Sequence, residues 1–291
     1  MKYRISVVIP TKDRPEYLRA CVASVLAEFP SDAEILVIDD NGSFPAAGAL
    51  KEMDQACLRI LHNKGTTGPS GARNFGVSQA RYEIILFLDD DDLLRPGYIA
   101  YVAQLAQSVR YGFSATHPFK EPPIELPNFI GSSVADVGSL PFRKQLAGLG
   151  CGFWIMRQDF LSLGGLDETL LVNEDTDFSI RILAAKVPGA YHAEPGVFVR
   201  THGAAQQGQN VGQITKRSKA VERAGFFTRI LEKNAEFFAT HPVADQYIRK
   251  RRAKMFAKAG RFSEGLTSSA PSLPTILYFL VNFVGYRIRR P

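Results

Sequence analysis

The stretch EIILFLDDDDLLRPGYI, from Glu83 to Ile99, places four carboxylates directly behind a run of apolar side chains. The apolar run, Ile84 to Leu88, predicts a buried strand. The four residues that follow without a gap, Asp89 to Asp92, repel one another unless a positive charge lies among them. Two interpretations are open at this point: a solvated turn after a strand, or a site for a divalent cation.

The first third of the chain alternates apolar runs with segments of helical periodicity. Continuous apolar runs are typical of strands that are covered on both faces, and they span Ile5–Pro10, Ala33–Asp40, Leu58–Asn63 and Ile84–Leu88. Helical spacing predicts helices over Arg14–Phe29, Ala46–Ala56, Ser70–Arg81 and Tyr98–Val109. This alternation predicts an α/β fold with a Rossmann-like, mostly parallel sheet flanked by helices.

A polar cluster follows each of the four predicted strands. The clusters are PTKDR (Pro10–Arg14), DDNGS (Asp39–Ser43), NKGTTGPSGARN (Asn63–Asn74) and DDDD (Asp89–Asp92). Ligands of such sheets bind outside the carboxyl ends of the strands, so we expect the clusters to converge on one edge of the sheet. The alternative is four separate solvated turns.

These motifs, in this order, resemble those of family 2 inverting glycosyltransferases with the GT-A fold. VVIPTKDR resembles the family's first strand and nucleotide loop, and EILVIDDNGS resembles its VVDDGS signature. TTGPSGARNFGV resembles its G-x-x-x-A-R-N-x-G element, and ILFLDDDDLLRPGYI its DxD strand with a trailing D-x-x-x-P. The motifs span Ile5 to Ile99, and GGLDE…NEDTDFSIR extends the likeness to about Arg181. Each motif is weak alone, but their shared order is specific.

The resemblance implies a donor site for a nucleoside-diphospho-sugar, with UDP as the expected nucleotide. It also implies Mn²⁺ or Mg²⁺, hard ions that favour oxygen ligands and neutralise a departing diphosphate. The implied metal ligands are Asp91 and Asp89, with Asp89 nearer the ribose. Asp92 is either a donor-site residue or the cap of a helix that begins at Leu93. The implied donor-binding residues are Pro10, Thr11, Asp13, Arg14, Asp39, Asp40, Arg73, Asp89 and Asp90.

Several of these donor-site residues have a structural alternative. Asp40, and less surely Asp39, would accept the N3–H of a uracil-type base, and one of the two is then structural. Arg14 either meets a phosphate or is an exposed arginine at a helix start. Arg73 either binds the anionic donor or pairs with a carboxylate of the cluster.

The resemblance also implies a catalytic base in NEDTDFSIRI (Asn173–Ile182). Its ED pair matches Glu174-Asp175, with Asp175 as the base and Glu174 as the residue that positions the acceptor. Carboxylates at a helix N-terminus also occur for dipole reasons alone. The segment GLGCGFW implies acceptor contacts by Gly150, Gly152 and Trp154, where Trp154 stacks on a sugar or belongs to the core. His202 is a candidate metal ligand or a structural histidine.

Composition and the later sequence set the expected organisation. We expect a GT-A domain over residues 1–215, with a nucleotide-sugar half over 1–110 and an acceptor half over 111–215, and a helical tail over 216–291. Residues 113–145 are expected to form a long loop or an acceptor-side insertion. The helical tail is expected to break at His241-Pro242 and at Ser268–Pro274. Three cysteines without CxxC spacing and no signal-peptide pattern suggest a cytoplasmic protein.

The basic C-terminus raises the question of membrane contact. Lys and Arg number 35 against 29 Asp and Glu, and the last residues combine TILYFLVNFVGY (Thr275–Tyr286) with Arg287, Arg289 and Arg290. The apolar run is shorter than the ~20 residues of a membrane span. We expect either a buried terminal helix or peripheral association with the inner membrane leaflet.

The expected function is metal-dependent, inverting transfer of a sugar to a glycan or lipid-linked acceptor in bacterial surface polysaccharide synthesis. No G-x-G-x-x-G follows the first strand and no glycine-rich loop ends in Gly-Lys-Ser/Thr, which disfavours dehydrogenases and P-loop enzymes. A sugar nucleotidyltransferase and a nucleotide-binding scaffold with an inactive GT-A fold remain the alternatives. No nucleic-acid partner is expected.

Overall fold

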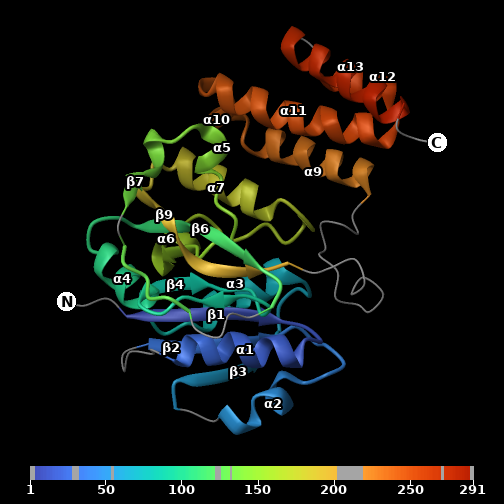
Figure 1. Cartoon of the computed structure of the whole chain (residues 1–291). Coiled ribbons are helices and arrows are strands. Elements are labelled where there is room, and N and C mark those ends of the chain that lie inside the picture. Colours follow the sequence, from blue (N-terminus) through green and yellow to red (C-terminus); the bar gives the residue numbers. More distant parts are fainter. Residues whose placement is uncertain are drawn as a thin grey trace. The chain divides into compact units, whose positions relative to one another are not determined.

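The computed structural model describes residues 4–27, 33–53, 56–121, 126–131, 133–201, 219–269 and 272–288 (Figure 1). The chain divides into two compact units. The first unit comprises Met1–Thr169 and Ala185–Val211, and the second comprises Leu170–Ala184 and Gly212–Pro291. The predicted boundary between residues 215 and 216 lies outside the described residues and stays a prediction.

Four parallel strands form one half of the sheet in the first unit, in the spatial order β3-β2-β1-β4. They are β1 (Ile5–Thr11), β2 (Ala33–Asp39), β3 (Leu58–His62) and β4 (Ile84–Phe87), as the apolar runs predict. The connecting helices are α1 (Pro15–Leu26), α2 (Ala46–Ala49), the 3₁₀ turn η1 (Lys51–Met53) and α3 (Pro69–Gln79). The α/β fold class is therefore confirmed.

Close packing of this half of the sheet explains why its sequence pattern predicts the strands correctly. All seven residues of β2 are buried, so both of its faces are covered. Helices α1 and α3 each begin with a proline, a residue that is compatible with the first turn of a helix. Gly76 lets α3 approach the sheet, since a Cβ there would lie 2.5 Å from the Val8 side chain.

The other half of the sheet mixes parallel and antiparallel pairs. Its order continues from β4 as β8-β6-β9-β5, and β7 pairs with β9. The strands are β5 (Leu93–Leu94), β6 (Tyr111–Phe119), β7 (Val134–Asp136), β8 (Trp154–Met156) and β9 (Gly189–Arg200). The helical elements are α4 (Tyr98–Leu105), η2 (Val137–Ser139), α5 (Phe142–Gln145) and α6 (Arg157–Ser162).

Two expectations for this half are wrong. Residues 113–145 are not one long loop, because β6 runs to Phe119 alongside β9 and β7 begins at Val134. No helix begins at Leu93, because Leu93 and Leu94 pair with Phe198 and Val197 as a short strand. Both errors concern strands whose partners lie more than fifty residues away, which local periodicity does not reveal.

The second unit is helical. Its helices are α7 (Glu174–Ala184), α9 (Ala220–Lys233), α10 (Ala235–Thr240), α11 (Pro242–Ala259), α12 (Phe262–Ser269) and α13 (Leu273–Ile288). Helix α11 packs against α9, α12 and α13, which Figure 1 shows in orange and red. The expected breaks at Pro242 and before Pro274 are present. Across the described ranges, no helix combines the length and the hydropathy that a bilayer crossing requires.

His192 of β9 is a buried titratable group in the first unit. It is fully buried, and neither ring nitrogen has a hydrogen-bond partner among the residues that the structure describes. The rings of Tyr101 and Phe129 pack edge-on against it, with centroids 4.9 and 6.0 Å away. Burial lowers the pKa of His192 to about 4, against the opposite influence of Glu194, which is itself paired with Arg95 at 2.7 Å.

We expect His192→Phe to weaken the pH dependence of stability. The unfolded chain binds a proton at this histidine below about pH 6.5, whereas the folded protein does so only near pH 4, so stability falls as pH drops through this window. Linkage predicts a loss of about 2 kcal/mol between about pH 7 and pH 5 that the variant lacks. Urea unfolding of both proteins at the two pH values measures it. If the free energy of unfolding of the two proteins depended on pH in the same way, the lowered pKa of His192 would be contradicted.

Candidate functional site

The four aspartates of the opening stretch lie at the carboxyl end of β4 and differ in exposure. Asp90 and Asp92 are buried, whereas Asp89 and Asp91 are partly exposed. Two arginines compensate their charge. Arg14 Nη1 donates to Asp90 Oδ1 and Asp91 Oδ2, both at 2.9 Å, and Arg73 Nη2 donates to Asp89 Oδ1. Arg73 thus pairs with the cluster, as one of its two interpretations predicted.

The carboxyl ends of β1, β2 and β3 meet at the same edge. Thr11 Oγ1 donates to Asp90 Oδ2 at 2.7 Å, which joins the β1 loop to the cluster. Asp13, with a positive φ of 57°, accepts from the backbone N–H of Phe44 at 2.9 Å and so holds the loop after β2. The structure therefore brings the predicted polar clusters together, and Pro10 precedes Thr11 at the end of β1.

Asp39 and Asp40 both serve as local anchors. Asp39 Oδ2 accepts from the Ala46 N–H at 2.9 Å, at the start of α2. Asp40 Oδ1 accepts from Asn63 Nδ2 at 2.7 Å, and its Oδ2 accepts from the Gly68 N–H at 2.9 Å. Asn63 was not among the candidate residues, although its place directly after a strand was the signal that could have identified it.

Among the described residues, the four carboxylates of the cluster outnumber the two arginines that pair with them, Arg14 and Arg73. Burial, together with Asp89 and Asp91, raises the pKa of Asp92 to about 9, even though the Arg200 N–H donates to its Oδ1 at 2.8 Å. Burial also raises the pKa of Asp90 to about 6, against the opposing influence of Arg14. A further cation at this edge would therefore lower the free energy of the ionised cluster. The cap role for Asp92 is wrong, because no helix begins at Leu93.

The loop before β8 lies against these carboxylates. A Cβ at Gly150 would be 2.8 Å from Asp89 Oδ2 and 3.7 Å from Asp92 Oδ2. Gly152 has a positive φ of 61° and its carbonyl accepts from the Tyr98 hydroxyl at 2.7 Å. Trp154 is fully buried in the main core, so its ring is not available to stack on a sugar. Of its two interpretations, the structural one holds.

Gly150→Ala is expected to interfere with the cluster without unfolding the protein. The added methyl would press on the Asp89 carboxylate, a partly exposed group that can shift its position. We expect donor binding to weaken about tenfold while the melting temperature stays close to that of the wild type. Gly138→Ala is the matched control, since its nearest atom is the Asp136 carboxylate at 3.2 Å, outside the cluster. Unchanged donor affinity in Gly150→Ala would argue against a donor site here.

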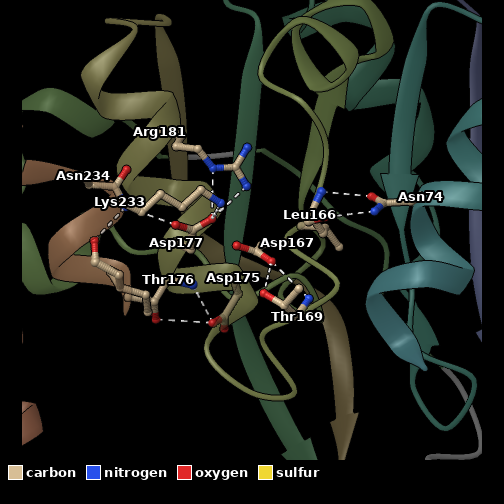
Figure 2. Close-up of polar contacts among 11 residues, drawn as sticks. Asn74, Leu166, Asp167, Thr169, Asp175, Thr176, Asp177, Arg181, Lys233 and Asn234 are labelled. Carbon is tan, nitrogen blue, oxygen red and sulfur yellow. Dashed lines mark hydrogen bonds and ion pairs between the residues drawn. The ribbon is translucent and has the colours of Figure 1, made fainter. Parts of the chain in front are cut away.

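Asn74 was missed as a positioning residue. Its Oδ1 accepts from the Leu166 N–H and its Nδ2 donates to the Leu166 carbonyl, both at 2.9 Å (Figure 2). Nδ2 also donates to Glu168 Oε1 at 2.8 Å. Asn74 follows Arg73 in α3, so this side chain ties the middle of that helix to the GGLDE segment. The positive φ values of Gly164 and Gly165, 82° and 67°, form the turn that precedes it.

The candidate base lies in the second unit, at the start of α7. The first turn of this helix carries Glu174, Asp175 and Asp177. The Thr176 N–H donates to Asp175 Oδ1 at 2.6 Å, as Figure 2 shows. Negative charge at a helix N-terminus is favourable on its own account. The roles of Asp175 as base and of Glu174 as positioner therefore stay predictions.

Asp177 is the polar centre of the second unit. Its fully buried carboxylate accepts from Arg181 at 2.9 Å, from Lys233 at 3.1 Å and from Asn234 at 3.1 Å (Figure 2). The sequence singled out Asp177 only as a neighbour of the candidate base. Its actual partners on α9 and after it lie more than fifty residues away, beyond the reach of local pattern.

Asp177→Ala is expected to destabilise the protein strongly. It leaves the Arg181 and Lys233 cations without their shared carboxylate, and breaking a buried ion pair in this way costs about 3–5 kcal/mol. Asp245→Ala removes an i,i+4 Asp–Arg pair of the same type on α11, but a partly exposed one, and is expected to cost less than about 1 kcal/mol. Urea unfolding measures both. A similar small loss for the two variants would contradict the assigned role of Asp177.

Of the expected metal ligands, the structure describes Asp89 and Asp91. His202 lies outside the described residues. Among the residues that the structure does describe, no three His, Cys, Asp or Glu side chains are arranged to hold a metal ion. The carboxylate oxygens of Asp89 and Asp91 are nevertheless the kind of ligand that Mg²⁺ and Mn²⁺ prefer.

Comparisons with known proteins agree with this fold. A family model described as Glycosyl transferase family 2 matches residues 6–158. The Campylobacter jejuni GalNAc(5)-diNAcBac-PP-undecaprenol beta-1,3-glucosyltransferase is 34% identical over 106 residues, which make up 35% of this chain and 34% of that protein. The chain thus aligns with about a third of the length of the first curated relatives it matches.

Two solved structures share the fold across nearly the whole chain. S. aureus TarS 1–349 in complex with UDP-GlcNAc has a TM-score of 0.72 at 14% identity, and the match covers 98% of this chain and 89% of TarS. The mannosyltransferase PcManGT from Pyrobaculum calidifontis, in complex with GDP-Man and Mn²⁺, has a TM-score of 0.59 at 16% identity, covering 100% of this chain and 82% of that one. At these identities the likeness shows the fold.

Proposed function

The chain belongs to glycosyl transferase family 2, and from this premise we propose that it moves a sugar from a UDP-sugar donor to a hydroxyl of a glycan or lipid-linked acceptor, with inversion at the anomeric carbon. It is a transferase with the GT-A fold. The UDP-GlcNAc bound by TarS supports the choice of nucleotide. The undecaprenol-linked acceptor named for the C. jejuni relative supports a lipid-linked acceptor, surface polysaccharide synthesis and a place at the inner membrane leaflet.

The observation that carries this proposal is the pattern of exposure in the acidic cluster. Asp89 and Asp91 correspond to the two ends of the DxD motif, and they are the two partly exposed members of the four. Asp90 and Asp92, by contrast, are buried and bonded to Thr11, Arg14 and the Arg200 N–H. Asp89 and Asp91 also pair with Arg73 and Arg14, but of the four carboxylates they alone keep exposed surface that a donor could reach.

Asp91 and Asp89 would hold a divalent cation in this proposal, and that cation would supply positive charge against the departing diphosphate. The Mn²⁺ in the PcManGT complex supports this assignment. Asp40 and Asp39 would orient the nucleobase of the donor, and Asp13 and Thr11 would lie at its ribose. Arg14 and Arg73 hold the carboxylates in place and would add cationic charge near the phosphates.

Asp175 acts as the base in the proposed reaction. Its carboxylate takes the proton of the acceptor hydroxyl as that oxygen attacks the anomeric carbon, and the bond from this carbon to the diphosphate breaks in the same step. Glu174 holds the acceptor hydroxyl in position. Gly150, where a Cβ would crowd Asp89, would leave space for the acceptor, and Gly152 would contact the acceptor from the same loop.

The test is to incubate the full chain with a panel of nucleotide sugars and soluble acceptor analogues, with Mn²⁺, with Mg²⁺ and with EDTA. Thermal shift reports donor binding, and release of the nucleoside diphosphate reports turnover. We expect one UDP-sugar to stabilise the protein and to be turned over only with metal. Donor binding without turnover in any condition would favour the inactive scaffold. Pyrophosphate release from UTP and a sugar 1-phosphate would favour the nucleotidyltransferase.

A further inference from the structure

Helix α13 (Leu273–Ile288) exposes an apolar face. Of its described side chains, those that the structure classes as exposed are Leu273, Pro274, Leu277, Val281, Val284 and Arg287. Five of these six are apolar, and Leu277 and Val281 are 54% and 73% exposed. The spacing of Leu273, Leu277, Val281 and Val284 places them on one face of a helix, which we call the α13 stripe. A helix in a globular protein normally exposes polar residues on its outer face.

The opposite face of α13 already has its partners within the second unit. Phe279 is fully buried and forms a cluster with Ala253 and Ala257 of α11. Its ring also lies 5.8 Å from that of Phe262 and 5.7 Å from that of Phe283. A Cβ at Gly265 of α12 would collide with the Phe279 ring, so these two helices pack as closely as glycine allows. The α13 stripe is therefore not needed to hold this helix on α11 and α12.

Cationic residues border the α13 stripe on both sides. Lys250, Lys254 and Lys258 follow one another at four-residue spacing along α11, and Lys250 Nζ lies 5.9 Å from the centre of the Tyr278 ring. On the other side, the Arg287 guanidinium lies 5.3 Å from the centre of the Phe283 ring. From Pro242 to Ile288 the sequence has eight Lys and Arg against two Asp and Glu, an excess of six that equals the net charge of the whole chain.

An apolar helical face between basic residues has the composition of an interfacial membrane helix. Apolar side chains enter the boundary between headgroups and acyl chains, while lysine and arginine extend toward anionic phosphates. A second copy of the chain fits less well, because a twofold contact through the α13 stripe would place the same cations opposite each other. At 16 residues, α13 is too short to cross a bilayer of about 30 Å, so it would lie along the surface.

We propose that the α13 stripe docks the protein on an anionic lipid surface. Leu277 and Val281 enter the bilayer boundary, and Lys254 and Arg287 contact the headgroups. This docking rests on the proposed function, which places the protein at a membrane surface, and it names the α13 stripe as the site of contact. Vesicle binding is measured without donor or acceptor. A failure of vesicle binding can therefore be distinguished from a failure of sugar transfer.

The test is co-sedimentation of the full chain with two kinds of vesicle: phosphatidylcholine alone, and phosphatidylcholine with about a third phosphatidylglycerol. We expect binding to the anionic vesicles that weakens steeply with added salt. The double variant Leu277→Gln/Val281→Gln is expected to bind at least about tenfold more weakly. Lys254→Gln and Arg287→Gln are each expected to lose about fivefold on anionic vesicles only.

Val243→Gln is the matched control, because Val243 is 72% exposed at the start of α11, outside the α13 stripe. We expect its binding to stay within about twofold of the wild type. All substituted side chains are exposed, and equal melting temperatures verify folding. Unchanged vesicle binding in the double variant would overturn the proposal. A second result would also overturn it: the wild type sediments as a dimer that does not bind vesicles, and the double variant sediments as a monomer. That result would assign the α13 stripe to contact with a second copy of the chain.

Discussion

Asp91→Asn is expected to reduce sugar transfer about a thousandfold, because it removes one of the two accessible carboxylates proposed to hold the cation that opposes the leaving-group charge. Stability should change little, since Asp91 is partly exposed and the Arg14 guanidinium keeps Asp90 as a partner at 2.9 Å. The measurement is the release of UDP across a series of Mn²⁺ concentrations. The variant should also require a higher Mn²⁺ concentration for half-maximal donor binding.

Asp159→Asn is the control for this experiment. Asp159 also pairs with an arginine, Arg110, at 2.6 Å, but outside the acidic cluster. Its activity and metal requirement should match the wild type. An Asp91→Asn protein that transfers sugar at the wild-type rate, with the same dependence on Mn²⁺, would disprove the assignment of Asp91 and with it the proposed site.

Asp175→Asn is expected to lower kcat for transfer by roughly 10²–10⁴-fold, the range for loss of a positioned general base. The amide keeps the size of the side chain and its ability to accept from the Thr176 N–H, but it cannot take a proton from the acceptor. Donor binding, followed by thermal shift, should be unchanged. The expected pattern is therefore intact donor affinity with a large loss of turnover.

Glu174→Gln separates the base from its neighbour. If Glu174 positions the acceptor, its amide variant should raise the acceptor KM more than it lowers kcat. If Glu174→Gln lost kcat fully while Asp175→Asn stayed active, Glu174 would be the base and Asp175 the residue that positions the acceptor. Wild-type turnover in both variants would place the base elsewhere and would refute this part of the proposal.

The parallel half of the sheet could be predicted from the sequence because its information is local. β2 is buried along its whole length. Its seven consecutive residues are apolar or carry a charge that a partner neutralises, and such a run predicts a strand covered on both faces. The mixed half could not be predicted in this way. β5 has two residues, and its partners in β9 lie about a hundred positions away, so the strand exists through pairing and not through propensity.

The candidate site shows the same division. The sequence predicted the acidic cluster and the β1 loop, and it gave pairing with the carboxylates as one of two interpretations of Arg73. It did not predict that Arg14 bridges Asp90 and Asp91, that the Arg200 N–H satisfies Asp92, or that Asn74 holds Leu166. Each of these contacts joins residues from elements that are 76 or more positions apart, which only the folded chain brings within hydrogen-bond distance.

The sequence by itself determined the family, the α/β sheet and the acidic edge, because each is encoded in short motifs with regular spacing. It also showed that the C-terminus is both apolar and basic. Only the tertiary structure decided which aspartates stay accessible, which are buried with raised pKa values, and which face of α13 is left exposed. Burial and charge compensation depend on neighbours that are distant in the chain, so they arise only when the elements pack together.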